Sequence, residues 1–137
     1  MSGPVNPPVS GSPDDWLRHA ASDLHLAGLA LPDAEVLRNQ VAFHAQQAAE
    51  KSLKAILVAR QIHFPRTHDL EALIEMIQLT GLAWPFAPAE IEALTPFAVE
   101  TRYPGGFAQV TDDEAIAAVN AARRVLEWAR GVIQPGS

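Results

Sequence analysis

The stretch Ala42–Leu70 constrains the fold most, because its composition predicts one long alanine-rich helix that stops before a proline. At 100° per residue, small and aliphatic residues gather on one side of this helix. That side comprises Val41, Ala45, Ala48, Ala49, Ser52, Ala55, Ile56 and Ala59, with Leu53 and Leu57 at its edge. Such residues let a neighbouring helix approach closely. We therefore expect a helix over about residues 34 to 62 that forms the seam of a bundle.

The other side of the same helix is polar, with residues spaced three and four positions apart. It comprises His44, Gln47, Lys51 and Lys54, with Glu50 beside them. One interpretation is a solvated or dimer-facing surface. The other is an anion site, in which Lys51 contacts phosphate as a point charge and His44 donates or stacks. Gln46 points nearer the apolar side, where burial would require it to find a hydrogen-bond partner that ties helices together.

Helix start and stop signals divide the rest of the chain. They predict a first helix over residues 12–31, a third from Thr67 or His68 to Gly81, and a kinked or split fourth over residues 88–99. The capping box Thr111-x-x-Glu114 begins a last helix over about residues 112–133, with Ile116 among its inward residues. No stretch alternates like a strand. We predict an all-α fold, an up-and-down antiparallel four-helix bundle with a short or kinked extra helix.

Size and charge limit the classes of protein to consider. The 137 residues suffice for one domain; we expect residues 1–11 to be a disordered tail and residues 12–134 a single helical domain. A net charge of −6 excludes a globally basic nucleic-acid binder, so a polyanion would need a local basic patch. The chain has no cysteine, which fits a cytoplasmic protein. No apolar run approaches the roughly 18 residues of a membrane span.

Three motifs occur in order: HAQQAAEKSLK at residues 44–54, PRTHDL at residues 65–70, and LTPFAVETRYP at residues 94–104. Together they resemble the HEPN domain family of bacteria and archaea, over about residues 14–133. The resemblance implies a four-helix bundle that is commonly dimeric. It also implies a setting beside a minimal nucleotidyltransferase, in pairs that resemble toxin–antitoxin modules, and binding of nucleotide or RNA.

Some members of that family are metal-independent ribonucleases with an Arg followed, four to six residues later, by a His near the start of the last helix. Arg102 lies in about that region, but no His follows it. Arg38 and His44 fit the spacing, but they lie on the wrong helix and helical geometry places them on opposite faces. A ribonuclease would have to combine Arg102 with His44 or His68 as cation and base.

Arg102 and Tyr103 allow two interpretations. In one, Arg102 pairs with Glu100 or Glu50 while Tyr103 packs over the end of the bundle. In the other, Arg102 supplies a second cation to a shared phosphate pocket.

His63, His68 and Asp69 flank the turn at Pro65, but the two histidines lack the i, i+4 spacing of a helical metal site. We therefore predict no metal and no cofactor. Asp69 or Thr67 is expected to cap the third helix, and His68 to bond locally.

The first hypothesis is an interaction and regulatory module, a homodimeric bundle that pairs with a minimal nucleotidyltransferase. It would bind nucleotide or RNA through His44, Gln47, Lys51, Lys54, Arg102 and Tyr103. One alternative is a metal-independent endoribonuclease with Arg102 and His44 as catalytic residues. Another is a purely structural dimer, and whether the chain is an enzyme stays undecided.

Overall fold

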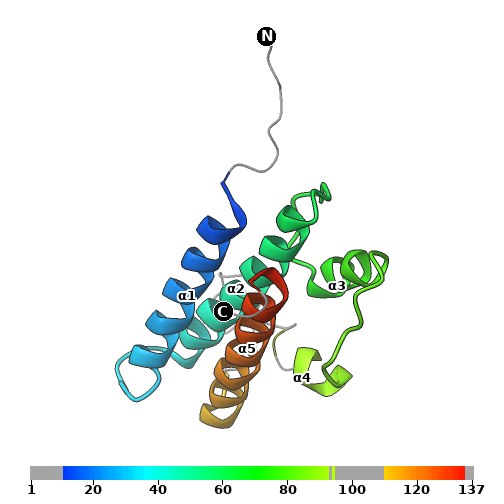
Figure 1. The fold of residues 1–137 in the computed structure, drawn as a ribbon. Helices are drawn as coiled ribbons and strands as arrows, with labels where there is room; N and C mark the ends of the chain where they lie inside the picture. The colour runs from blue at the N-terminus through cyan, green and yellow to red at the C-terminus, as the bar shows by residue number, and fades with distance from the viewer. Residues whose placement is uncertain (1–10, 93, 95–109, 135–137) are drawn as a thin grey trace.

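A computed structural model describes residues 11–92, 94 and 110–134 of the chain. Helices account for all the regular secondary structure in these residues, so the predicted all-α helical bundle is confirmed. They are α1 (Pro13–Ala30), α2 (Arg38–Ala59), α3 (Leu70–Gln78), α4 (Pro88–Glu92) and α5 (Asp112–Ile133), shown in Figure 1. The predicted N-terminal tail except for Gly11, and the fourth helix beyond residue 92 except for residue 94, lie outside the described residues.

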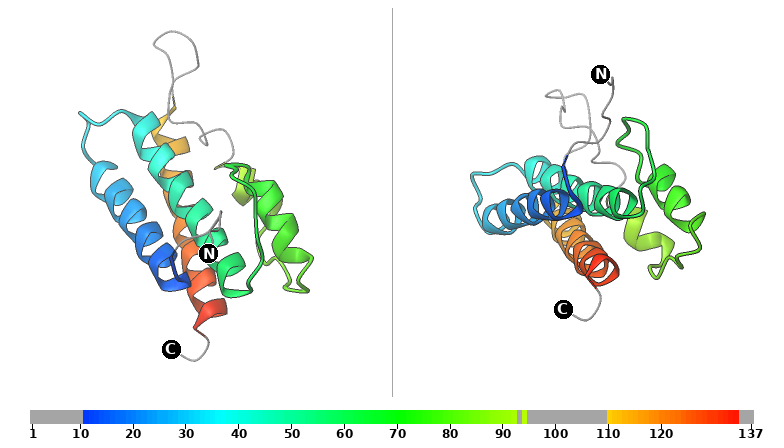
Figure 2. Two further views of the ribbon diagram at one scale, coloured as in Figure 1. Left: turned by 90° about the horizontal axis from the view of Figure 1, so that it is seen from above. Right: turned by 45° about the horizontal axis from the view of Figure 1, so that its top comes forward.

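The centre of the molecule is α2, which packs against α1, α3 and α5. Figures 1 and 2 show α1 on one side of α2 and α3 on the other, with α5 packed across α1 and α2. Thirteen of the 22 residues of α2 are buried, polar ones among them. Burial on nearly every side explains the alanine content, because small side chains let several neighbours approach one helix.

The ends of α2 differ from the predicted range of 34 to 62. The carboxylate of Asp33 accepts a hydrogen bond from the Glu35 N–H at 3.0 Å, which holds residues 33–36 in a turn before the helix. At the other end Gln61 has a φ of 59°, in the left-handed region, and a helix cannot continue through that conformation. The helix is therefore about two turns shorter than its composition suggests.

The connection between α2 and α3 is an extended segment, residues 62–69, that returns along α2. Its last residues reach the middle of α2, where the Gln46 side-chain amide donates to the His68 carbonyl at 3.4 Å. Asp69 caps α3 as predicted, since its carboxylate accepts the N–H groups of Glu71 at 3.0 Å and Ala72 at 3.4 Å. Met76 of α3 lies beside Ile62 at the end of α2, so α3 runs in the same general direction as α2.

Both long outer helices begin at capping boxes. Ser12 and Asp15 exchange hydrogen bonds of 3.1 Å at the start of α1, and Thr111 and Glu114 exchange bonds of 2.9 and 3.1 Å at the start of α5. The predicted bounds of α5 are confirmed. The prediction for Ile116 is wrong: its side chain is 42% exposed, because the stripe that α5 buries passes through Ala115 and Val119 instead.

An aromatic cluster ties the loop before α4 to the last helix. Trp84 and Phe86 of the loop pack edge-to-face against each other and against Trp128 of α5, with ring centroids 5.1 to 5.8 Å apart. Edge-to-face geometry is favourable for aromatic pairs. No helix in the part of the chain that the structure describes combines the length and the apolar character that a membrane crossing requires.

Candidate functional site

The first two sequence motifs meet at one buried carboxylate, that of Glu50, which is 3% exposed. Lys54 Nζ lies 2.8 Å from its Oε2 atom and His68 Nδ1 lies 2.9 Å from its Oε1 atom. The side-chain amides of Gln46 and Gln47 approach the same Oε1 at 3.3 and 3.4 Å. A buried carboxylate needs such partners, since isolated burial of a charge is very costly. We call these five residues the Glu50 cluster.

Lys54 does not lie on an open basic surface, so that part of the prediction is wrong. Its residue exposure is 8%, and its ammonium group sits 5.9 Å from the Trp16 ring centroid and 5.6 Å from that of Phe64. The physical reason is the returning segment 62–69, which carries Phe64 over this side of α2. Paired to Glu50 and covered by two rings, the Lys54 charge holds α1, α2 and the returning segment together.

The two glutamines also belong to the cluster. Gln46 is fully buried and joins α2 to the returning segment, which confirms the structural role predicted for it. Gln47 donates to the Gln46 side-chain oxygen at 2.9 Å. His68 bonds to Glu50 and not locally as predicted, although its side chain remains 64% exposed.

Lys51 and His44 meet a different carboxylate, Asp23 of α1. Lys51 Nζ lies 2.6 Å from Asp23 Oδ2, and His44 Nδ1 lies 3.4 Å from Asp23 Oδ1. All three side chains are partly exposed, at 25%, 29% and 16% for Lys51, His44 and Asp23. Sequence reasoning missed Asp23, because nothing in the sequence fixes the rotation of α1 against α2.

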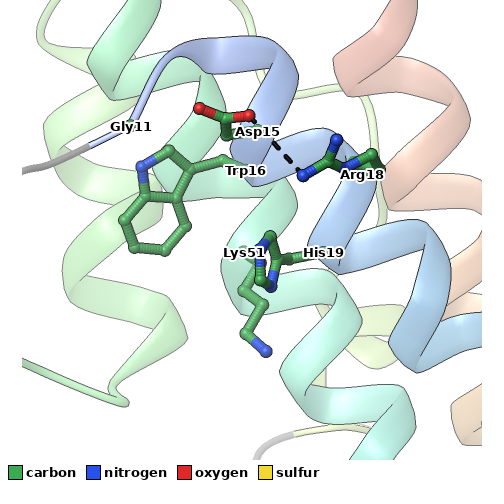
Figure 3. A pocket seen from close by; sticks show the side chains of 6 residues that line it. All are labelled: Gly11, Asp15, Trp16, Arg18, His19 and Lys51. Atoms are coloured by element: carbon green, nitrogen blue, oxygen red, sulfur yellow. Dashed lines mark ion pairs between the residues drawn. The ribbon is translucent and has the colours of Figure 1, made fainter.

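Lys51 also lines a pocket of about 570 Å³ between the first turns of α1 and the middle of α2. The other lining residues are Gly11, Asp15, Trp16, Arg18 and His19. Figure 3 shows the Trp16 ring on one side of this hollow and the side chains of Arg18, His19 and Lys51 on the other. We call it the Lys51 pocket. It combines an aromatic ring with three basic side chains, of which sequence reasoning had identified only Lys51.

The polar groups of the Lys51 pocket are only partly satisfied within the described residues. The Ser12 N–H donates to the Asp15 carboxylate and lowers the pKa of that group below its ordinary value, an effect to which Arg18, 3.8 Å away, adds. The Trp16 indole nitrogen is buried and has no hydrogen-bond partner among the described residues. Lys51 has three donors and Asp23 accepts one of them, so two remain for a ligand.

The remaining candidates lie elsewhere. Arg102 and Tyr103 fall outside the described residues. Arg38 donates to four backbone carbonyls at the α1–α2 connection, while His44 faces Asp23, so the two do not form a catalytic pair. Within residues 11–92, 94 and 110–134, no three His, Asp or Glu side chains are grouped as a metal site requires.

Comparison with known proteins places this geometry in a family. The family model of the HEPN domain matches residues 13–132. The crystal structure of ST0689, an archaeal HEPN homologue, superposes with a TM-score of 0.68 at 25% identity, over 91% of this chain and 100% of that chain. The crystal structure of TT1696 from Thermus thermophilus gives a TM-score of 0.67 at 27% identity, over 88% of this chain and 97% of that chain. Among curated proteins no relative was found. The resemblance inferred from the three motifs is confirmed, and the chain belongs to the HEPN domain family.

Proposed function

We propose that this chain is a HEPN interaction and regulatory module that binds a nucleotide or a short RNA at the Lys51 pocket. The observation that carries this proposal is the gathering of Arg18, His19 and Lys51 opposite the Trp16 ring. Cationic side chains bind phosphate oxygens, and an aromatic ring stacks on a nucleobase. The position of Asp23 behind Lys51 orients the ammonium group while leaving donors free.

The residues proposed to bind the ligand differ from those predicted from the sequence. Lys54 and Gln47 are engaged in the Glu50 cluster, so their part is to fix the position of α2. Of the residues predicted on the polar side of α2, Lys51 and His44 remain within reach of a ligand, and both contact Asp23. Arg102 and Tyr103 stay candidates for the same site, and their contribution depends on whether residues 95–109 bring them near Lys51.

We further propose that the chain is a homodimer that acts in the cytoplasm beside a minimal nucleotidyltransferase, in a toxin–antitoxin-like pair. The support is membership of the HEPN family together with the order of its three motifs. Co-expression with the nucleotidyltransferase encoded in the neighbouring gene, followed by affinity purification, tests the pairing. Recovery of a complex of the two chains is the expected result. A genome with no such neighbour, or a neighbour that fails to co-purify, would remove this part of the proposal.

The ligand site is tested by titrating ATP and a short RNA oligonucleotide into the purified chain by calorimetry. We expect saturable binding that Lys51→Met weakens about tenfold, because a charge-assisted hydrogen bond to phosphate contributes roughly 1.5–3 kcal/mol. Methionine keeps the length and apolar stem of lysine and removes the ammonium group together with its pair to Asp23.

Arg60→Met is the matched control, since Arg60 is an exposed cation just beyond the end of α2 and away from the Lys51 pocket. Its affinity should equal that of the unmodified chain. Equal affinities for Lys51→Met and the unmodified chain would reject the Lys51 pocket as the site, whatever the ligand.

A further inference from the structure

A second hollow lies on another face of the molecule, between α1 and α5, with a volume of about 420 Å³. Leu24 and Leu29 of α1 and Leu126 of α5 line it. Gly28 lies between Leu24 and Leu29 in sequence, and a Cβ atom added there would meet no atom within 4 Å beyond its chain neighbours and its own helix backbone. The side chain of Leu29 is 63% exposed. The hollow therefore has an apolar floor that the described residues leave open.

A third hollow lies beyond it, toward the start of α5. The helices run antiparallel, because the Gln134 side chain near the end of α5 bonds to Asp14 at the start of α1 at 2.8 Å. This hollow, of about 650 Å³, lies between the α1–α2 connection, with Leu31 and Leu37, and the first turns of α5, with Ile116. The paired side chains of Arg38 and Asp112 line it as well. Leu37 is 65% exposed and Ile116 42%. Isolated exposed leucines are ordinary, but several in neighbouring hollows favour an interaction surface.

The rim of the second hollow is basic, although the chain carries a net charge of −6. His25, Arg123 and Arg130 line it. Within the described residues neither arginine forms an ion pair, and Arg123 bonds only to the Asn120 amide oxygen at 2.9 Å. This contrasts with the next residue, Arg124, which pairs with Glu90. Glu127, on the same helix, forms no ion pair with either arginine in the described residues. Exposed cations beside an apolar groove favour a partner that brings carboxylates.

We propose that the α1–α5 groove binds an amphipathic helix of a partner protein, with apolar side chains along the floor and Glu or Asp facing Arg123 and Arg130. The ten residue steps from Ile116 to Leu126 span on the order of 15 Å, which accommodates about three turns of a bound helix. Anchors at i, i+4 and i+7 are the usual pattern of a helix in a groove. This surface is separate from the Lys51 pocket, so the proposal does not depend on nucleotide binding.

Charge also argues against a second copy of this chain as the occupant. A two-fold symmetric dimer would place this groove against itself. The basic rims, with Arg123 and Arg130 of both copies, would then face one another, and like charges in an interface are unfavourable. Dimerisation through a different surface would leave the groove open.

The test uses the full chain and a synthetic fluorescent peptide, an alanine-based helix with leucines at i, i+4 and i+7 flanked by glutamates. Fluorescence anisotropy should show saturable binding that weakens with salt. A peptide with lysine in place of every glutamate should bind at least about tenfold more weakly. Arg123→Glu with Arg130→Glu should weaken binding of the acidic peptide to a similar extent.

Two glycine variants separate blocking of the groove from a general effect. Gly28→Leu fills the groove, whereas Gly131→Leu places the same side chain in open space on α5 outside the groove. Both replace a helical glycine by a better helix former, so both should fold. We expect Gly28→Leu to weaken peptide binding at least about tenfold and Gly131→Leu to leave it unchanged.

Four results would overturn the proposal. One is the absence of saturable binding by the acidic peptide at millimolar concentration, and a second is equal binding of acidic and basic peptides. Another is identical binding by Gly28→Leu and Gly131→Leu. The last is sedimentation showing that the unmodified chain is a dimer and Gly28→Leu a monomer, since the groove would then be covered by a second copy.

Discussion

Replacing Glu50 with alanine is expected to lower the free energy of unfolding by about 3–5 kcal/mol, the usual effect of removing one partner of a buried ion pair. The Lys54 side chain is 10% exposed and would lose its carboxylate at 2.8 Å. The amides of Gln46 and Gln47 and the ring of His68 would lose an acceptor as well. The Trp16 and Phe64 rings, 5.9 and 5.6 Å from the ammonium nitrogen, attract it by only about 0.5–2 kcal/mol, so they do not replace the carboxylate. Urea unfolding followed by circular dichroism measures the change.

Two further variants identify the cause of that loss. Glu75→Ala, at an exposed position on α3, should change stability by less than about 0.5 kcal/mol and serves as the control. Replacing Glu50 and Lys54 together by Leu and Met should recover much of the lost stability, because a buried ion pair can often be exchanged for apolar side chains of similar volume. If Glu50→Ala were as stable as Glu75→Ala, the Glu50 cluster would not hold the helices together.

Arg38→Ala is expected to have the second largest effect, a loss on the order of 3 kcal/mol, because hydrogen bonds from a charged donor contribute roughly 1.5–3 kcal/mol each and are not additive. The guanidinium donates to the carbonyls of Leu31 at 2.6 Å, Asp33 and Val36 at 3.0 Å, and Ala30 at 3.2 Å. It therefore caps the end of α1 and shapes the connection to α2. The measurement is again the urea midpoint.

The form of the side chain matters at this position. Arg38→Lys should recover only part of the loss, because an ammonium group cannot present the planar fork of donors that reaches several carbonyls at once. Arg60→Ala, an exposed arginine just beyond the end of the same helix, is the control. Full stability of Arg38→Lys would mean that charge alone, and not the geometry of these four bonds, stabilises the connection.

The parts of the fold that sequence predicts well are those that local chemistry decides. A capping box needs only residues three positions apart, so the starts of α1 and α5 follow from Ser12 with Asp15 and Thr111 with Glu114. Asp69 caps α3 for the same local reason. The periodicity of α2 likewise identifies it as the helix that packs against several neighbours.

The sequence does not predict how the helices are rotated against one another or which path the connecting segments take. The path of residues 62–69 along α2 covers Lys54 and leaves Lys51 open, although the two lysines lie three residues apart on one helix. The partner of Lys51, Asp23, lies 28 residues away on another helix. Ile116 fits the periodic pattern of a core residue but faces the α1–α5 groove, because packing angle rather than periodicity decides which side of α5 is covered.

We assign Lys54 of α2 a structural role and Lys51 a binding role. Unfolding Lys54→Met and Lys51→Met side by side in urea tests this assignment most directly. We expect Lys54→Met to lose about 2–4 kcal/mol, since it leaves a carboxylate that is 3% exposed without its cation. Lys51→Met should lose about 1 kcal/mol or less, because its pair with Asp23 is partly open to solvent. Equal losses, or a greater loss for Lys51→Met, would contradict the separation of the two lysines into structural and binding roles.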